Sequence, residues 1–179
     1  MATDGDVIIR PAGVRDALEI ERVRAESWRT AYRGIVKDET LERLGMDGWA
    51  ERWANGFRPE EGQFVLAAQT ANGEMVGFIE GGPTREDWRD YPGEIYMIYI
   101  MTSFQGRGIG SRLLCAAYDV LSAQDRVPMH LQAMKENARS LEFYRRAGGR
   151  PLGFERGFEI DGIPLIDYPL GWTKRPFTD

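Results

Sequence analysis

Three glycines at alternate positions in the middle of the chain could hold a phosphate group. The run from Glu94 to Met101 is rich in residues that favour strands, and Gly106, Gly108 and Gly110 follow it after a short polar turn. Glycine lets the backbone approach a ligand closely, and the free N–H groups at the start of a helix favour an anion. A strand, a glycine loop and a helix in this order predict a pyrophosphate site.

The residues after the loop predict a helix that holds the loop against a core. Apolar side chains at spacings of three, four and seven form one stripe, made of Ile109, Leu113, Leu114, Ala117, Val120 and Leu121. Two common nucleotide loops fit poorly. A Walker loop needs a lysine after its last glycine, and none follows Gly110; a dinucleotide fingerprint needs two residues before its last glycine, and only one separates Gly108 from Gly110. A nucleotide-binding protein is therefore the weaker interpretation of the loop.

The run Gln105-Gly106-Arg107-Gly108-Ile109-Gly110 resembles the Gln/Arg-x-x-Gly-x-Gly/Ala motif of the GNAT superfamily of N-acetyltransferases. In that superfamily the motif cradles the pyrophosphate of acetyl-CoA. The resemblance implies that this cofactor is held by Gln105, Gly106, Arg107, Gly108, Ile109, Gly110 and Ser111. It also implies main-chain contacts to the pantetheine arm from Ile98, Tyr99 and Ile100.

A second motif, from Asn137 to Gly148, resembles the GNAT pattern Asn-x-x-Ala/Ser-x-x-Phe-Tyr-x-x-x-Gly. Seven residues make nearly two helical turns, so Asn137 and Tyr144 share a face about 10 Å apart. The resemblance implies that Asn137 and Ser140 contact the cofactor and that Tyr144 protonates the departing thiolate. Because free tyrosine has a pKa of about 10 and a thiol about 8.5, a hydrogen bond to the sulfur is the alternative.

The acceptor amine must lose a proton before it attacks, because an ammonium group has no lone pair. Glu94 lies eleven residues before Gln105, which matches the base of the histone-acetylating branch of the superfamily. A water relay is the alternative base, and a solvated carboxylate at a strand end is the plain structural explanation of Glu94. In the branch that acetylates ribosomal protein N-termini, a glutamate stands where this chain has Gln132, so a close match to that branch is disfavoured.

Aromatic side chains gather between Trp28 and Phe57, and most of them are expected in the core. Trp28, Tyr32 and, on the central strand, Tyr96 are the candidates for contact with the acceptor. The start of this segment also looks like small bacterial GNAT members, including some that act on polyamines. The charged loop from Gly82 to Gly93 is expected at the surface, near the site.

Composition restricts the class of protein. The 179 residues fit one domain, residues 1–179, and a net charge of −5 gives no support for nucleic acid as a partner. The polar N-terminus and the absence of a long apolar run predict a cytoplasmic protein without a membrane partner. The single cysteine, Cys115, excludes an intrachain disulfide and is expected to pack in a helix, and His130 is expected in the core or at the surface.

Other elements follow from periodicity and turn residues. Strands are expected at 7–10, 63–69, 74–81, 94–101, 127–134, 153–160 and 163–170, and helices at 16–28, from about 38 past 49, after the glycine loop, and at 137–146. This order predicts an α/β (α+β) domain with a mixed, mostly antiparallel central sheet flanked by helices. It is similar to the GNAT fold over nearly the whole chain.

The main interpretation is an N-acetyltransferase that moves acetyl from acetyl-CoA to a primary amine by direct attack in a ternary complex. Glu94 or a water relay is the base, Tyr144 is the general acid, and no metal is required. The acceptor is expected to be a small amine such as a polyamine or an amino acid. An acyl-CoA sensor without turnover and a protein or peptide N-acetyltransferase are the alternatives, and a homodimer is compatible with the aromatic surface.

Overall fold

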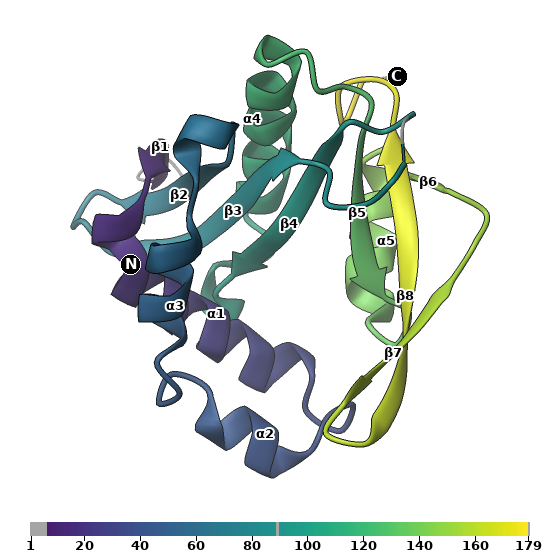
Figure 1. Cartoon of the computed structure of the whole chain (residues 1–179). Helices are drawn as coiled ribbons and strands as arrows, with labels where there is room; N and C mark the ends of the chain where they lie inside the picture. Colours follow the sequence, from purple (N-terminus) through teal and green to yellow (C-terminus); the bar gives the residue numbers. More distant parts are fainter. Residues whose placement is uncertain (1–6, 89, 179) are drawn as a thin grey trace.

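The computed structural model describes residues 7–88 and 90–178 (Figure 1). The strands are β1 (Val7–Ala12), β2 (Phe64–Thr70), β3 (Met75–Pro83), β4 (Gly93–Ile100), β5 (Met129–Met134), β6 (Arg150–Pro151), β7 (Arg156–Ile160) and β8 (Ile163–Trp172). The α-helices are α1 (Ala17–Ala31), α2 (Asp38–Arg43), α3 (Trp49–Gly56), α4 (Ile109–Ala123) and α5 (Ala138–Arg146). No helix in these two ranges has the length and apolar composition of a membrane span.

The strands form one sheet in the order β1-β2-β3-β4-β5-β8-β6, with β7 paired to β8. Only β4 and β5 run parallel, and their ladder joins Gly93–Ile95 to Met129–Leu131. Beyond Ile95 the two strands diverge, as Figure 1 shows between the teal and green strands. The predicted mixed, mostly antiparallel sheet flanked by helices is confirmed, and the splay leaves the end of β4 without a partner on that side.

Helices cover both faces of the sheet. Leu113, Leu114 and Leu121 of α4 are fully buried, and each contributes about 1.5–3 kcal/mol by its removal from water. On the other face, α1 buries Ile20 and Val23 completely. Since neighbouring side chains of β4 point to opposite faces, Tyr99 meets α1 while Ile100 lies toward α4.

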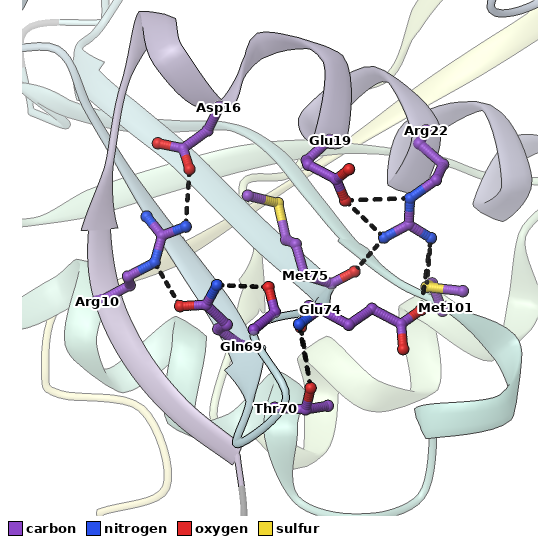
Figure 2. Close-up of polar contacts among 10 residues, drawn as sticks. Arg10, Asp16, Glu19, Arg22, Gln69, Thr70, Glu74, Met75 and Met101 are labelled. Atoms are coloured by element: carbon purple, nitrogen blue, oxygen red, sulfur yellow. Dashed lines mark hydrogen bonds and ion pairs between the residues drawn. The ribbon is translucent and has the colours of Figure 1, made fainter.

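Polar contacts hold the first strand and helix on the β2–β3 hairpin (Figure 2). Nε of Arg10 in β1 donates to Oε1 of Gln69 at 2.8 Å. The guanidinium of Arg22 in α1 donates to the carbonyl oxygen of Met75 at 2.6 Å and to Sδ of Met101 at 3.3 Å. Because Met101 directly follows β4, these contacts keep α1 over the diverging end of that strand.

Some boundaries differ from those predicted. The single helix expected from about residue 38 is two helices, α2 and α3, because Gly45 and Gly48 adopt φ values of +85° and +70° between them. Strand β1 continues through Pro11, which an edge strand tolerates because it needs no inward N–H there. Strand β6 has only two residues and had no signal in the sequence.

Candidate active site

A cavity of about 850 Å³ opens where β4 and β5 diverge. Its walls come from the last turn of α1, the strands β4 and β5, the glycine loop, α5 and the ring of Phe177. All the predicted site residues are described, and all of them line this cavity except Trp28, Glu94 and Arg107. The fold thus joins the two sequence motifs around one volume, which is within the usual size range of ligand pockets.

The glycine loop ends in an open helix start. Gly106 and Gly108 have φ values of +77° and +74°, which favour glycine, and Gly108 is the N-cap of α4. This residue has no side chain to cap the helix, so the first N–H groups of α4 are left for a ligand. Gly110 allows close packing, because an added Cβ would lie 3.2 Å from both Ile100 and Phe143.

Side chains fix the loop from both ends. Nε2 of Gln105 donates to the carbonyl oxygen of Ile100 at 2.9 Å, which ties the loop to the end of β4. Arg107 instead donates to the carbonyl oxygen of Ser103 at 3.0 Å, and its guanidinium lies 5.0 Å from the centre of the Phe104 ring. Gln105 therefore positions the loop at the cavity, whereas Arg107 supports it from outside.

Tyr144 lies in a buried group of phenols with Tyr32 and Tyr99. Burial raises the pKa of Tyr144, and the other two phenols raise it further. Burial also raises the pKa of Tyr99, whose hydroxyl accepts a hydrogen bond of 2.8 Å from Nε1 of Trp28. The hydroxyl of Tyr144 has no hydrogen-bond partner among the described residues, so it is neutral and available as a donor to a ligand.

Two features orient Tyr144. Oδ1 of Asn137 accepts from the N–H of Ser140 at 3.1 Å and so caps α5. The Tyr144 ring meets Phe143 and Trp172 edge to face, with centroid distances of 5.3 Å and 6.1 Å. Asn137 therefore has a structural role that the sequence interpretation did not include, besides its place in the cavity wall.

Glu94 lies outside the cavity. It belongs to the paired part of β4, opposite His130, and is only 1% exposed. Its carboxylate accepts from the N–H of Arg85 at 2.8 Å and from the guanidinium at 2.6 Å. The structure thus pairs the buried Glu94 with the largely exposed Arg85 and does not place it in the cavity that Tyr144 lines.

The aromatic candidates have different positions. Tyr32 and Tyr96 line the cavity, whereas Trp28 packs on Tyr32 at 4.6 Å and supports the hydroxyl of Tyr99. Tyr96 donates to the carbonyl oxygen of Pro83 at 2.5 Å, and burial with the nearby Glu94 raises its pKa to about 12. The three candidates therefore belong to one region. The N–H of Trp28 and the hydroxyl of Tyr96 already donate hydrogen bonds within the protein.

Sequence reasoning missed several wall residues. Ser27 and Thr30 lie near the end of α1, on either side of Trp28, where the aromatic segment begins. Phe177 had no signal, because the chain end reaches the cavity only through tertiary contacts. One of these joins Arg175 to Asp119 of α4 at 2.7 Å.

The other candidate groups are packed in the structure. His130 is fully buried, its Nε2 lies 2.9 Å from Oγ1 of Thr84, and burial lowers its pKa to about 4. Sγ of Cys115 donates to the carbonyl oxygen of Pro176 at 3.5 Å, and burial raises the pKa of this thiol. Residues 7–88 and 90–178 contain no group of three His, Cys, Asp or Glu side chains that could hold a metal.

A diverging strand pair, an uncapped glycine loop and a buried phenol around one cavity suit a ligand that carries phosphate at one end and accepts a hydrogen bond at the other. The model of the acetyltransferase (GNAT) family matches residues 20–149, so the chain belongs to this family and is an acetyl-CoA-dependent acetyltransferase. The family and the enzyme class predicted from the two motifs are confirmed.

Similar proteins cover nearly the whole chain. An uncharacterized N-acetyltransferase of Bacillus subtilis (strain 168), YuaI, is 32% identical over 166 residues, which are 93% of this chain and 92% of that protein. The L-methionine sulfoximine/L-methionine sulfone acetyltransferase of Pseudomonas aeruginosa is 30% identical over 175 residues, covering 94% and 91% of the two chains. A PaiA N-acetyltransferase of Thermoplasma acidophilum, solved with coenzyme A, superposes with a TM-score of 0.69 at 20% identity, covering 93% and 99%, and shows the same fold.

Proposed function

We propose that this enzyme transfers acetyl from acetyl-CoA directly to the primary amine of a small molecule, within a ternary complex. The observation that carries the proposal is the single cavity that both the open start of α4 and the phenol of Tyr144 line. A bound thioester that entered from the loop would therefore end near a hydrogen-bond donor. Cys115 takes no part, since it does not line the cavity.

The cofactor would be held mainly by main-chain groups. The N–H groups from Gly106 to Ser111 face the pyrophosphate, where the positive end of the α4 dipole favours negative charge. The backbone of Ile98, Tyr99 and Ile100 lacks a β5 partner and can pair with the amides of pantetheine, as a strand would. Asn137 and Ser140 complete the wall on the α5 side.

The amine nitrogen attacks the thioester carbonyl, and the carbon–sulfur bond then breaks with the electron pair on sulfur. Burial raises the pKa of Tyr144 above that of a free phenol, which is itself about 1.5 units above a thiol. Tyr144 therefore stabilises the leaving sulfur by donating a hydrogen bond more readily than by losing its proton. Because Arg85 occupies the carboxylate of Glu94, we assign removal of the amine proton to a water relay.

The acceptor is a small molecule in this proposal. Support comes from the relatives, which include the methionine sulfoximine enzyme and a mycothiol acetyltransferase of Clavibacter michiganensis that is 34% identical over 110 residues. The cavity is bounded by α1 and by the tail at Phe177, which suits a compact acceptor better than a long peptide.

The test measures thiol release from acetyl-CoA with polyamines, amino acids, aminoglycosides and peptides, with the acetylated product identified by mass spectrometry. Turnover with at least one small amine is expected. Coenzyme A binding in calorimetry without thiol release from any acceptor would support the acyl-CoA sensor instead. Acetylation restricted to peptides would support the protein or peptide N-acetyltransferase.

A further inference from the structure

A second cavity, of about 340 Å³, adjoins the first and shares the side chain of Gln132 with it. Four charged side chains line this smaller cavity: Arg85, Glu86, Arg156 and Asp167. Two of them are cationic and two are anionic, so the lining has little net charge but offers both positive and negative groups to a ligand.

Strand register places the smaller cavity on one face of the sheet. In β8, Asp167 lies opposite Met134 of β5 and opposite Arg156 of β7. Residues that face each other across strands share a face, as do residues two apart along a strand, so Gln132 lies on it too. Met134 and Gln132 also line the larger cavity, which links the two cavities along this face.

Helix α5 lies on the opposite face. Tyr168, the neighbour of Asp167, points away from the charged cavity, and the guanidinium of Arg145 in α5 lies 5.8 Å from its ring centre. Tyr144 therefore approaches the splay from one face, and the charged side chains lie on the other. This arrangement suits an acceptor that meets the thioester from the side opposite the phenol.

The charged groups keep free hydrogen-bonding positions. Arg156 forms an ion pair with Glu86 through Nη1 at 2.5 Å, and its Nε and Nη2 have no hydrogen bond to a described residue. Arg85 uses Nε and Nη2 on Glu94, which leaves Nη1. The half-buried carboxylate of Asp167 accepts no hydrogen bond within the described part of the chain.

We infer that the smaller cavity is the acceptor subsite and that it binds an α-amino acid. The carboxylate of the ligand lies on the free N–H groups of Arg156 and Arg85, a geometry that guanidinium groups favour. The amine lies beside Asp167 and Gln132, at the entrance to the larger cavity. A polyamine has no carboxylate to accept from the free N–H groups of Arg156 and Arg85, so the amino acid is the better match of the two. This inference rests on the proposed acetyl transfer.

The test compares L-amino acids with the amines formed by removal of their carboxyl group, using kcat/KM for thiol release from acetyl-CoA. The wild-type enzyme is expected to prefer the amino acid by about tenfold or more, because charge-assisted hydrogen bonds are strong. Arg156→Gln should reduce this ratio by about tenfold or more, mainly through KM. Arg156→Lys should restore part of it, since the charge returns without the planar fork.

Arg156 is preferred to Arg85 as the test position, because loss of Arg85 would leave the buried Glu94 unpaired and endanger folding. Arg52→Gln is the matched control, since Arg52 pairs with Asp47 on the surface at 3.2 Å, away from both cavities. Its ratio should equal that of the wild type.

Two results overturn the inference. The first is equal kcat/KM for simple amines and for amino acids, which would reject the amino-acid subsite but still support the proposed acetyl transfer. If no acceptor releases thiol, the proposed transfer fails, and calorimetry of L-methionine with the coenzyme A complex then decides the subsite. Binding that Arg156→Gln weakens supports it, whereas no binding, or equal binding by both proteins, rejects it.

Discussion

Tyr144 combines a fixed ring with a hydroxyl that is left free. Edge-to-face packing holds the ring, and within the described residues the protein offers the hydroxyl no partner. Such a group adds nothing to the folded protein by hydrogen bonding. Its oxygen is therefore available for a bound thioester.

We expect Tyr144→Phe to lower kcat by about 10- to 100-fold, because a donor to the leaving sulfur acts only as charge develops there. The affinity for coenzyme A and the stability of the protein should change little, since no partner of the hydroxyl is lost. Steady-state kinetics and calorimetry measure the two effects. Tyr118→Phe, at a partly buried position of α4 that does not line the cavity, is the control. Equal losses of affinity and kcat in Tyr144→Phe would show that Tyr144 mainly positions the cofactor.

Glu80 is a buried acid of β3 that the mechanism does not use. It is 6% exposed, and its Oε2 accepts from Nε1 of Trp53 at 3.0 Å. Burial raises its pKa from 4.5 to about 7, although the Trp53 hydrogen bond and the charge of Arg85 oppose the rise. Because the folded protein then holds this proton more tightly than the unfolded chain, Glu80 lowers stability as pH rises from about 4.5 through about 7.

Replacement of this acid should therefore be stabilising at high pH. Glu80→Gln keeps an acceptor for Trp53 but has no charge to bury. Relative to the wild type, its free energy of unfolding should rise by about 2.5 kcal/mol between pH 5 and pH 8, as the pKa difference implies. Urea denaturation at the two pH values gives this quantity. Glu51→Gln, an exposed change in α3, should show no such rise. If Glu80 titrated with its ordinary pKa, the difference in unfolding free energy between Glu80→Gln and the wild type would be the same at both pH values.

The glycine loop and α4 act as one element. Gln105 anchors the loop to β4, and the backbone at Gly106 and Gly108 turns through positive φ before the helix begins. The stripe of buried leucines then holds α4 against the sheet. The open N–H groups are therefore rigidly placed before any ligand arrives, which reduces the entropy lost on binding.

We expect Gly108→Ala to lose about 1–2 kcal/mol of stability, because an L-residue is strained at φ +74°. It should also weaken coenzyme A binding by about tenfold, since the added methyl group occupies open space beside the cavity. Gly73→Ala is the matched control: its φ is +86° at the tip of the β2–β3 hairpin, remote from the cavity. Denaturation should show a similar loss for both variants, and an equal affinity for coenzyme A in both would contradict a phosphate role for the loop.

At the scale of the whole molecule, an anionic cofactor can bind only if the local positive potential at its site outweighs the repulsion from the negative net charge. The protein carries a net charge of −5, yet the proposed cofactor is an anion. The open start of α4 attracts negative charge locally, and Arg139 and Arg146 line the same cavity. Surface charge elsewhere is screened within about 10 Å at ordinary salt concentrations.

Coenzyme A should therefore stabilise the fold as a whole. At about 100 times its Kd it adds about 2.7 kcal/mol to the free energy of unfolding, which corresponds to a rise in Tm of about 5–10 °C. Thermal denaturation with coenzyme A, ATP and NAD at equal concentrations measures this. A matching shift with ATP or NAD would favour the nucleotide-binding interpretation, whereas a shift with coenzyme A alone agrees with the family.

Patterns among residues close together in the sequence were enough to predict many of the structural elements and the family. Helical periodicity, strand alternation and turn residues predicted the strand, loop and helix unit, the helix with Tyr144 and the mostly antiparallel sheet. The two motifs predicted the family. The range of the domain and the homodimer stay predictions.

Other features depended on packing between distant segments. Glu94 had the right spacing for a base, but the structure turns it toward Arg85 in the loop before β4. The smaller cavity joins Arg85, Gln132, Arg156 and Asp167 from separate parts of the chain. Strand order and register bring them together, and these depend on long-range pairing that no local pattern records. The glycine loop could therefore be recognised from the sequence, whereas the surroundings of Glu94 and the lining of the smaller cavity required the tertiary structure.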